Sequence, residues 1–181
     1  MDGNRFAIVE EEEHRINIFE ISDTTTTIDH TEVINSLQVG KNKPDNKGFE
    51  GIAYDEVKQR IYLVNEKRPK QLIAIDGFLN KCEKIRIKID FRLLPRYLFM
   101  DDLSGLHFDA KTRHLLYLSE QSNLVAEGSL DGEVISYMEL KKGYSGLKVD
   151  VPKAEGITMD EDRNIYIVSE PNLFYQFVRK N

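Results

Sequence analysis

A hairpin motif occurs three times in this sequence at nearly even spacing, and this repeat constrains the fold more than any other feature. Its first arm has glutamate or serine at the second position, glycine at the third and aspartate at the end, at residues 49–55 (FEGIAYD), 103–109 (LSGLHFD) and 154–160 (AEGITMD). Its second arm is an apolar run that ends in glutamate, at residues 61–66 (IYLVNE), 115–120 (LLYLSE) and 165–170 (IYIVSE). The copies begin 54 and 51 residues apart.

Each copy is typical of an antiparallel β-hairpin. The second arm has the continuous apolar character of a strand covered on both faces, and a short polar segment joins it to the first arm. A third strand is predicted at residues 71–75, 124–129 and 173–178, and a fourth at 84–89 and 134–140. Four short antiparallel strands that recur about every 40–50 residues predict an all-β fold, a β-propeller of four-stranded antiparallel blades. A β-sandwich is the alternative, but it gives no reason for the same glycine hairpin to recur evenly.

The first 45 residues fit the same register. Residues 6–11 (FAIVEE) match the second arm, and residues 16–19 match the third strand. The glutamate that would pair with Glu11 falls before Met1, so we expect an incomplete propeller of about three to four blades, truncated at its N-terminus. The predicted single domain, residues 1–181, divides into a partial blade at 1–45, blades at 46–100 and 101–150, and a partial blade at 151–181.

Charge and hydropathy limit the kinds of partner. The formal net charge is −6, so basic residues that would neutralise phosphates are not in excess, and no nucleic-acid partner is expected. No apolar run reaches the length of about 18 residues that a transmembrane helix needs. The N-terminal residues lack the basic and apolar regions of a signal peptide, which predicts a cytoplasmic protein if Met1 is the true start.

Carboxylates of the repeat are predicted to converge at one end of the blades. In an antiparallel hairpin, the start of the first arm lies beside the end of the second. The expected pairs are Glu50 with Glu66, Ser104 with Glu120, and Glu155 with Glu170. Because blades are related by rotation, all three pairs are expected on one rim of the central channel. Asp102, just before the second copy, reaches that rim too.

Such a rim has two interpretations, and both remain open at this point. Converging carboxylates repel one another, and a hard divalent cation such as Ca²⁺, which accepts several oxygen ligands in irregular geometry, would relieve that repulsion. The absence of nearby histidine or cysteine argues against zinc. The candidate ligands are Glu50, Glu66, Asp102, Glu120, Glu155 and Glu170. Alternatively, these side chains bond to backbone N–H groups and to Lys67 and Arg68, and so hold neighbouring blades together.

The candidates differ in their position along the repeat. Glu50 and Glu155 begin strands that line the channel, which makes them the first candidates for metal ligands. A structural role is favoured for Glu66, Glu120 and Glu170, at the ends of the second arms. The glycines after the rim positions (Gly51, Gly105, Gly156) are expected where the channel is crowded or the backbone bulges. The aspartates at the ends of the first arms (Asp55, Asp109, Asp160) are expected to accept hydrogen bonds from turn backbone N–H groups.

Several motifs occur together in a fixed order, at residues 46–55, 65–69, 102–106, 118–120, 154–157 and 169–172. In this ordered set the chain resembles the SdiA-regulated family of bacterial proteins, of the YjiK/CarP type, over essentially its whole length. The resemblance implies a β-propeller that is exported or attached at the cell envelope, with links to calcium and no established enzymatic activity. The family's N-terminal portion, including any leader, has no counterpart in this sequence.

Two classes of function follow from these observations. The first is a non-catalytic envelope propeller that binds Ca²⁺ at the channel mouth and acts in calcium handling or as an interaction platform for a protein partner. The second is a metal-dependent hydrolase, of lactonase or phosphoesterase type, that uses the channel cation. A hydrolase needs an open coordination position and a general base, and only Glu66 is placed for the latter role. The sequence therefore favours the first class and predicts no catalytic residues.

Overall fold

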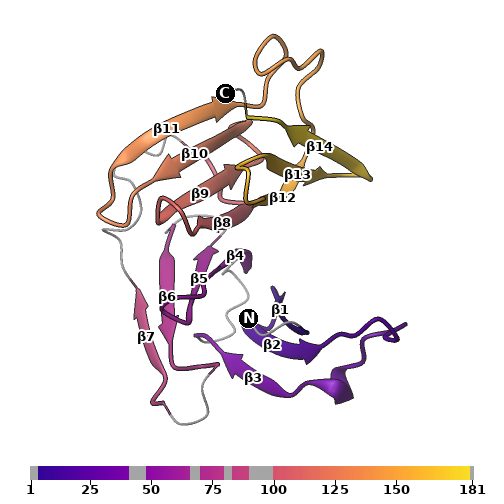
Figure 1. Cartoon of the computed structure of the whole chain (residues 1–181), viewed down its shortest axis with the longest axis vertical. Coiled ribbons are helices and arrows are strands. Elements are labelled where there is room, and N and C mark those ends of the chain that lie inside the picture. The colour runs from indigo at the N-terminus through magenta and orange to yellow at the C-terminus, as the bar shows by residue number, and fades with distance from the viewer. Residues whose placement is uncertain (1–3, 41–47, 66–69, 80–82, 90–99, 180–181) are drawn as a thin grey trace.

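The computed structural model describes residues 4–40, 48–65, 70–79, 83–89 and 100–179. These residues form four antiparallel sheets, which we number blade 1 to blade 4 in chain order. In Figure 1 the blades follow one another around an arc, from blade 1 in indigo to blade 4 in yellow. Fourteen strands and one short helix make up the described part of the chain.

The strands of each blade follow one another in sequence order. Blade 1 consists of β1 (Arg5–Glu10), β2 (Arg15–Glu20) and β3 (Asn35–Gln38), with the 3-10 helix η1 (His30–Glu32) before β3. Blade 2 consists of β4 (Phe49–Asp55), β5 (Arg60–Asn65), β6 (Leu72–Asp76) and β7 (Arg86–Ile89). Blade 3 consists of β8 (Gly105–Asp109), β9 (His114–Ser119), β10 (Leu124–Gly128) and β11 (Val134–Glu139). Blade 4 consists of β12 (Ala154–Met159), β13 (Ile165–Ser169) and β14 (Leu173–Phe177).

The strands predicted from the repeat are present, within two residues at their ends. The apolar second arms are β5, β9 and β13, and residues 6–11 correspond to β1, as the register of the first 45 residues requires. Strand β3 was not predicted, because its sequence NSLQ has no apolar run. It forms through pairing with β2, in which Arg15 lies opposite Gln38 and Ile18 opposite Asn35.

The hydrophobic core lies between the blades. Three clusters of buried side chains fill the spaces between blades 1 and 2, 2 and 3, and 3 and 4. Tyr62 of β5 and Tyr117 of β9 are fully buried, and the Tyr62 ring stacks on Phe108 of blade 3. Burial raises the pKa of the Tyr117 hydroxyl above its usual range. Sheets that pack face to face in this way make each blade depend on its neighbours for stability.

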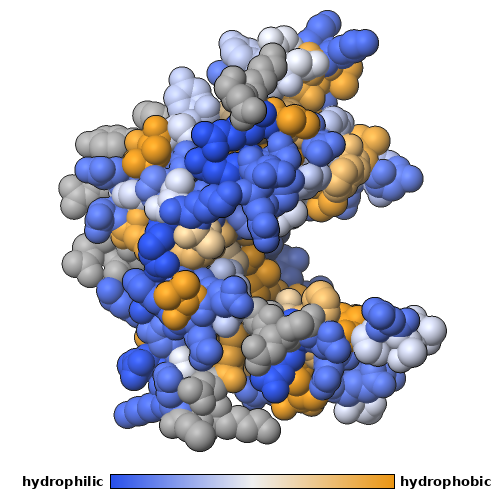
Figure 2. Space-filling model, viewed as in Figure 1, coloured by the Kyte–Doolittle hydropathy of each residue, from blue (hydrophilic) through white to orange (hydrophobic). Residues whose placement is uncertain are grey.

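The inner strands lie side by side across the blades, β4 next to β8 and β8 next to β12. Figure 2 shows the resulting curved molecule, which has the outline of a C with an open notch on one side. All hairpin turns between the first and second arms lie at one end of the inner strands, and the starts of β4, β8 and β12 lie at the other. We call this second end the rim.

Candidate functional site

Two β-bulges determine how the rim glutamates are presented. In blade 2, Phe49 pairs with Asn65 and Gly51 with Val64, so Glu50 is the extra, bulged residue. In blade 4, Glu155 has the same place between Ala154 and Gly156. A bulge re-aims the side chain of the extra residue away from the regular ladder. The bulges therefore direct both glutamates at the rim, where the sequence places them at the start of inner strands.

The pairing within the hairpins also differs from the predicted pairing. The sequence places Glu50 opposite Glu66, but Asn65 is the last residue of β5 and lies opposite Phe49. In blade 3, Gly105 pairs with Leu118, and Ser104 donates its backbone N–H to the Leu118 carbonyl at 2.9 Å. Ser104 is thus not directly opposite Glu120. The predicted register is thus wrong by one position along all three hairpins, including that of blade 3, which has no bulge, and the bulges of blades 2 and 4 add a second position.

Crowding explains the glycines after the rim positions. A Cβ atom at Gly51 would lie 2.5 Å from Val64 Cγ2 and 2.9 Å from the carbonyl carbon of Gly105 in the next blade. A Cβ atom at Gly156 would lie 2.6 Å from Val168 Cγ2. Both glycines follow a bulged residue. The prediction of a crowded or bulged backbone is confirmed at these two positions.

Asp102 is buried and takes part in a turn. Its carboxylate accepts a hydrogen bond from the Ser119 hydroxyl, and Oδ1 accepts a second from the backbone N–H of Gln121 at 3.2 Å. Ser119 Oγ in turn accepts from the backbone N–H of Ser122 at 3.1 Å. Asp102 therefore fixes the link between β9 and β10, a structural role that leaves its carboxylate only partly available to a ligand.

The charges of three other carboxylates at the rim affect the pKa of Glu155. Its pKa is raised, first by partial burial and then by the negative charges of Glu170, Glu120 and Asp102, while Lys153 acts in the opposite direction. These groups come from blades 3 and 4 and the segment between them. The structure thus brings together four of the six candidate ligands in one electrostatic environment.

Lys153 also lies among these rim carboxylates, although the sequence analysis did not predict it there. Its Nζ lies 2.7 Å from Glu170 Oε2, and both side chains are more than half exposed. The pKa of Lys153 is raised, first by the hydrogen bond to Glu170 and then by the charges of Glu170, Glu120 and Glu155. The ammonium group of Lys153 therefore neutralises part of the negative charge of these carboxylates.

The two remaining candidates are Glu50 and Glu66. Glu50 is half-buried at the bulge of β4 in blade 2. Glu66 lies outside the described residues, as do Lys67 and Arg68. Across the described ranges, no three His, Cys, Asp or Glu side chains are grouped closely enough to hold a metal ion.

At the opposite end of the blades, the hairpin aspartates bind their own turns. Asp55 accepts from the Lys58 backbone N–H at 3.2 Å, Asp109 from Lys111 at 2.9 Å, and Asp160 from Asn164 at 2.8 Å. The predicted role of these aspartates is confirmed.

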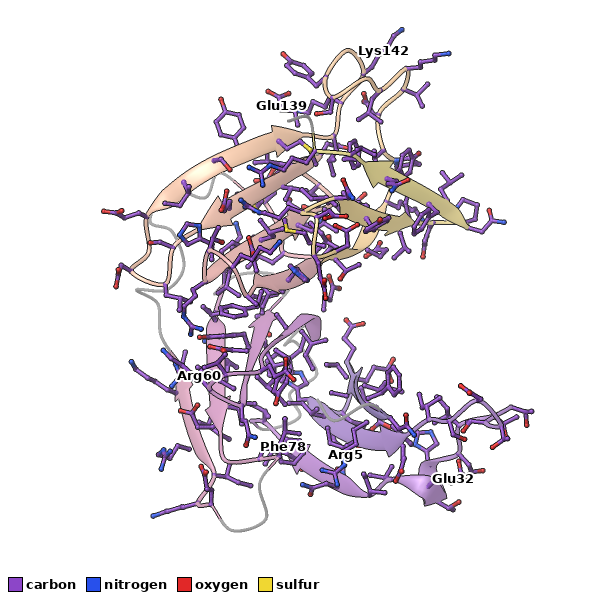
Figure 3. The ribbon with its side chains drawn as sticks, in the orientation of Figure 1. Arg5, Glu32, Arg60, Phe78, Glu139 and Lys142 are labelled. Carbon is purple, nitrogen blue, oxygen red and sulfur yellow. The ribbon has the colours of Figure 1, made fainter. Side chains whose placement is uncertain are left out.

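Two of the hairpin aspartates also bind an arginine from the next blade. Arg113 Nη2 lies 2.6 Å from Asp55 Oδ2, and Arg163 Nε lies 3.1 Å from Asp109 Oδ2. Both arginines occupy the last position of a turn with positive φ, 61° and 66°. These contacts were not predicted, although an arginine at the same place in two of the three copies was a usable signal. Arg60, labelled in Figure 3, instead pairs within blade 2, with Asp76 at 2.7 Å.

The one helix in the described residues, η1, has three residues, and no helix there is long and apolar enough to cross a membrane.

Solved structures with a similar fold are β-propeller proteins. One is a protein of unknown function from Bacteroides thetaiotaomicron (TM-score 0.57, 16% identity over 92% of this chain and 40% of that chain). A second is the glutaminyl cyclase of Myxococcus xanthus (TM-score 0.55, 12% identity, 90% and 56%). A third comes from a nidogen/laminin complex (TM-score 0.54, 14% identity, 99% and 63%). At these identities the likeness concerns the fold alone, and the chain spans less than two thirds of each matched structure.

The family is established by the sequence itself. The SdiA-regulated family model matches residues 1–178, essentially the whole chain. The blades seen in the structure, together with the propeller fold of its structural neighbours, confirm the fold that the resemblance implied. This chain belongs to the SdiA-regulated family of β-propeller proteins.

Proposed function

We propose that this protein is a non-catalytic propeller that binds Ca²⁺ at the rim of its channel. The proposal is supported by the carboxylates around Glu155, whose pKa is raised first by partial burial and then by the negative charges of Glu170, Glu120 and Asp102, against the opposing charge of Lys153. A divalent cation between these groups would relieve their repulsion. The biological role we propose is calcium handling, or an interaction platform, at the cell envelope; the envelope and calcium are what the family resemblance implies.

The donor chemistry at the rim fits a hard cation. All candidate ligands are carboxylates, and Ca²⁺ binds oxygen donors with little demand on geometry. Two of them are already engaged, Asp102 by Ser119 and Gln121, and Glu170 by Lys153. An ion would therefore rely first on Glu155 and Glu120 and would displace Lys153 from Glu170. Such competition predicts modest affinity.

The alternative, a metal-dependent hydrolase, receives less support. A general base has to be deprotonated near the working pH. Lys153, a basic side chain among the described rim residues, has a raised pKa because of the neighbouring carboxylates, which keeps it protonated, and Glu66, the general base that the sequence offered, lies outside the described residues. A binding role is therefore the better match to the rim electrostatics.

Calorimetric titration with Ca²⁺ tests the proposal. The wild-type chain is expected to bind saturably, and the double variant Glu120→Gln/Glu155→Gln is expected to lose at least about tenfold in affinity, the equivalent of 1.4 kcal/mol. Glu56→Gln/Glu133→Gln, which replaces two exposed glutamates in the β4–β5 and β10–β11 turns, is the matched control with the same charge change. Absence of binding to the wild type, or equal binding by the double variant, would contradict a metal site at the rim.

A further inference from the structure

The outermost strand of blade 2, β7, alternates basic and apolar residues along its whole length. Its sequence is RIKI, and the two residues before it, Lys84 and Ile85, continue the alternation. All residues from 83 to 89 are exposed. The strand lies on the convex outer side of the arc in Figure 1, and within the described part of the chain it pairs with β6 alone. As the fourth strand of a four-stranded blade, β7 presents an edge whose backbone N–H and C=O groups can pair with another strand.

A row of alternating charges crosses blade 2 and ends at this edge. Arg60 of β5 donates two hydrogen bonds to the carboxylate of Asp76 on β6, at 2.7 and 2.9 Å. Asp76 lies opposite Arg86 of β7, so these two side chains share a face of the sheet. The pKa of Asp76 is lowered first by the hydrogen bond from Arg60, and the charge of Arg86 acts in the same direction. The row is thus positive, negative and positive, and its last cation lies at the edge.

The cations on this face of β7 outnumber the carboxylates near them. Lys88 is two positions from Arg86 and therefore on the same face, and Lys84 occupies the alternate position before the strand. Glu83 is the one acidic residue from 83 to 89, and it falls in the alternate set that contains the isoleucines. Both oxygens of Asp76 already accept hydrogen bonds within the blade. Among the described residues of β6 and β7, this face therefore carries an excess of positive charge.

The other face of the edge is apolar. Ile87 lies opposite Ile75 and Ile89 opposite Ile73, and both of these partners belong to the core between blades 1 and 2. The two isoleucines of β7 nevertheless remain 45% and 50% exposed. They line a cavity of about 150 Å³, whose wall also includes Phe49. A strand added to β7 would extend this apolar face and cover the exposed isoleucines.

Charges on an edge strand can also serve only to prevent aggregation. The outermost strands described in blades 1 and 3 do not use cations for this purpose, since their sequences are NSLQ in β3 and VISYME in β11. The basic residues are therefore particular to β7 and are not a general device of these blades. Protection of the edge also gives no reason for the exposed isoleucines on its other face.

We propose that β7 binds an extended segment of a partner protein in which acidic and apolar residues alternate, and that this segment adds a fifth, antiparallel strand to blade 2. Acidic residues of the segment lie opposite Arg86 and Lys88 and continue the row of alternating charges. Apolar residues lie opposite Ile87 and Ile89. In such strand addition, backbone pairing supplies affinity and the alternate side chains supply specificity. The proposal does not depend on the ion site at the rim.

A second copy of this chain offers no such segment among its described outer strands. Its own β7 would place cations opposite cations. Its β11 has one acidic residue, Glu139 at the last position, and its β3 has none. The charge pattern of the edge therefore favours a different protein as the partner.

Fluorescence anisotropy with a labelled seven-residue peptide tests the proposal. The probe alternates valine with glutamate and has valine at both ends, and saturable binding to the full chain is expected. A peptide of the same composition with its glutamates grouped at one end keeps the charge but cannot match alternate positions, so it is expected to bind at least about tenfold more weakly. N-methylation of alternate backbone amides should weaken binding for only one of the two alternate sets, because only alternate residues of a strand pair toward a given neighbour.

Charge reversal on β7 gives a sharper comparison. The double variant Arg86→Glu/Lys88→Glu is expected to prefer a peptide with lysine in place of each glutamate, by at least about tenfold over the probe. Lys88→Glu alone, opposite Ala74 on β6, should change the preference in the same direction to a smaller extent. Lys141→Glu/Lys148→Glu, in the exposed β11–β12 connection, matches the double variant in net charge and should keep the wild-type preference. All of these lysines and Arg86 are exposed, so the variants are expected to fold, which thermal unfolding checks.

Three results would overturn the proposal. They are no saturable binding of the probe to the wild-type chain at concentrations up to about 1 mM, equal binding of the peptide with grouped glutamates, and an unchanged preference in the charge-reversed variants. Sedimentation velocity provides a further arm. Self-association of the wild-type chain that Arg86→Glu/Lys88→Glu abolishes and the probe does not reverse would assign the β7 edge to a second copy instead.

Discussion

The guanidinium of Arg113, in the turn between β8 and β9, lies 2.6 Å from the carboxylate of Asp55 in the preceding blade. The Asp55 side chain is 1% exposed and that of Arg113 35%, so the contact reaches from the surface into the interface between blades 2 and 3. Arg163 repeats the contact with Asp109 between blades 3 and 4. Each of these two hairpin turns is thus tied to the blade before it by a charged pair.

Replacing Arg113 with alanine is expected to destabilise the fold by about 2 kcal/mol, because the buried Asp55 carboxylate loses its cation. Urea unfolding measures the change, and Lys142→Ala, an exposed lysine labelled in Figure 3, is the control expected to change stability by less than about 0.5 kcal/mol. In the double variant Asp55→Asn/Arg113→Ala, the loss should be smaller than the sum of the single losses. Additive losses would contradict a direct pair.

The two bulge glycines are expected to differ in their tolerance of a methyl group. At Gly51 the added Cβ meets the backbone of Gly105 at 2.9 Å, which cannot yield without separating two blades, so Gly51→Ala should cost about 2 kcal/mol. At Gly156 the close neighbour is Cγ2 of Val168, a side chain that is 50% exposed and can turn away. Gly156→Ala should therefore cost less than about 1 kcal/mol. Equal losses in thermal unfolding would contradict this reading of the inner strands.

The sequence predicted the strands well because the repeat supplies three versions of the same pattern. The apolar runs of β5, β9 and β13 and the polar turns before them left little freedom in placing the hairpins. Strand β3 was not predicted because only one of its four side chains is apolar. It is a strand because it pairs with β2, and not because of a local preference of its residues.

The candidate site was only partly predictable. The rim position of Glu155 and its neighbours Glu120 and Glu170 follows from the hairpin pattern, and the charges of Glu170 and Glu120 contribute to the raised pKa of Glu155. The bulges at Glu50 and Glu155 shift the register by one residue, which alternation alone cannot reveal. Lys153 was missed because it lies in the connection between blades, outside the repeat.

The pKa of Glu155 leads to a pH-dependent prediction. A carboxyl whose pKa in the folded protein exceeds its unfolded value, near 4.5, favours folding below that value and loses this contribution as the pH rises through the folded pKa. Glu155→Gln removes the charge and should stabilise the protein at pH 7 by less than about 1 kcal/mol, since the exposed carboxyl is screened by solvent. Thermal unfolding of both proteins from pH 7 to pH 4 should show the difference shrinking toward acid pH. A constant difference, or one shared by Glu133→Gln, would contradict the electrostatic cause.

The Lys153 ammonium occupies the place where the proposed Ca²⁺ would have to act, 2.7 Å from Glu170 and within the field of Glu120 and Glu155. On that proposal, Lys153→Met removes an internal competitor, and Ca²⁺ affinity should rise by about three- to tenfold at moderate salt. The same replacement at the exposed Lys142 controls for the change in net charge and should leave the affinity within about twofold. Calorimetric titration of the three proteins side by side provides the measurement. Weaker binding by Lys153→Met would mean that the ammonium group holds the rim carboxylates in position for the ion, and it would contradict competition between the two cations.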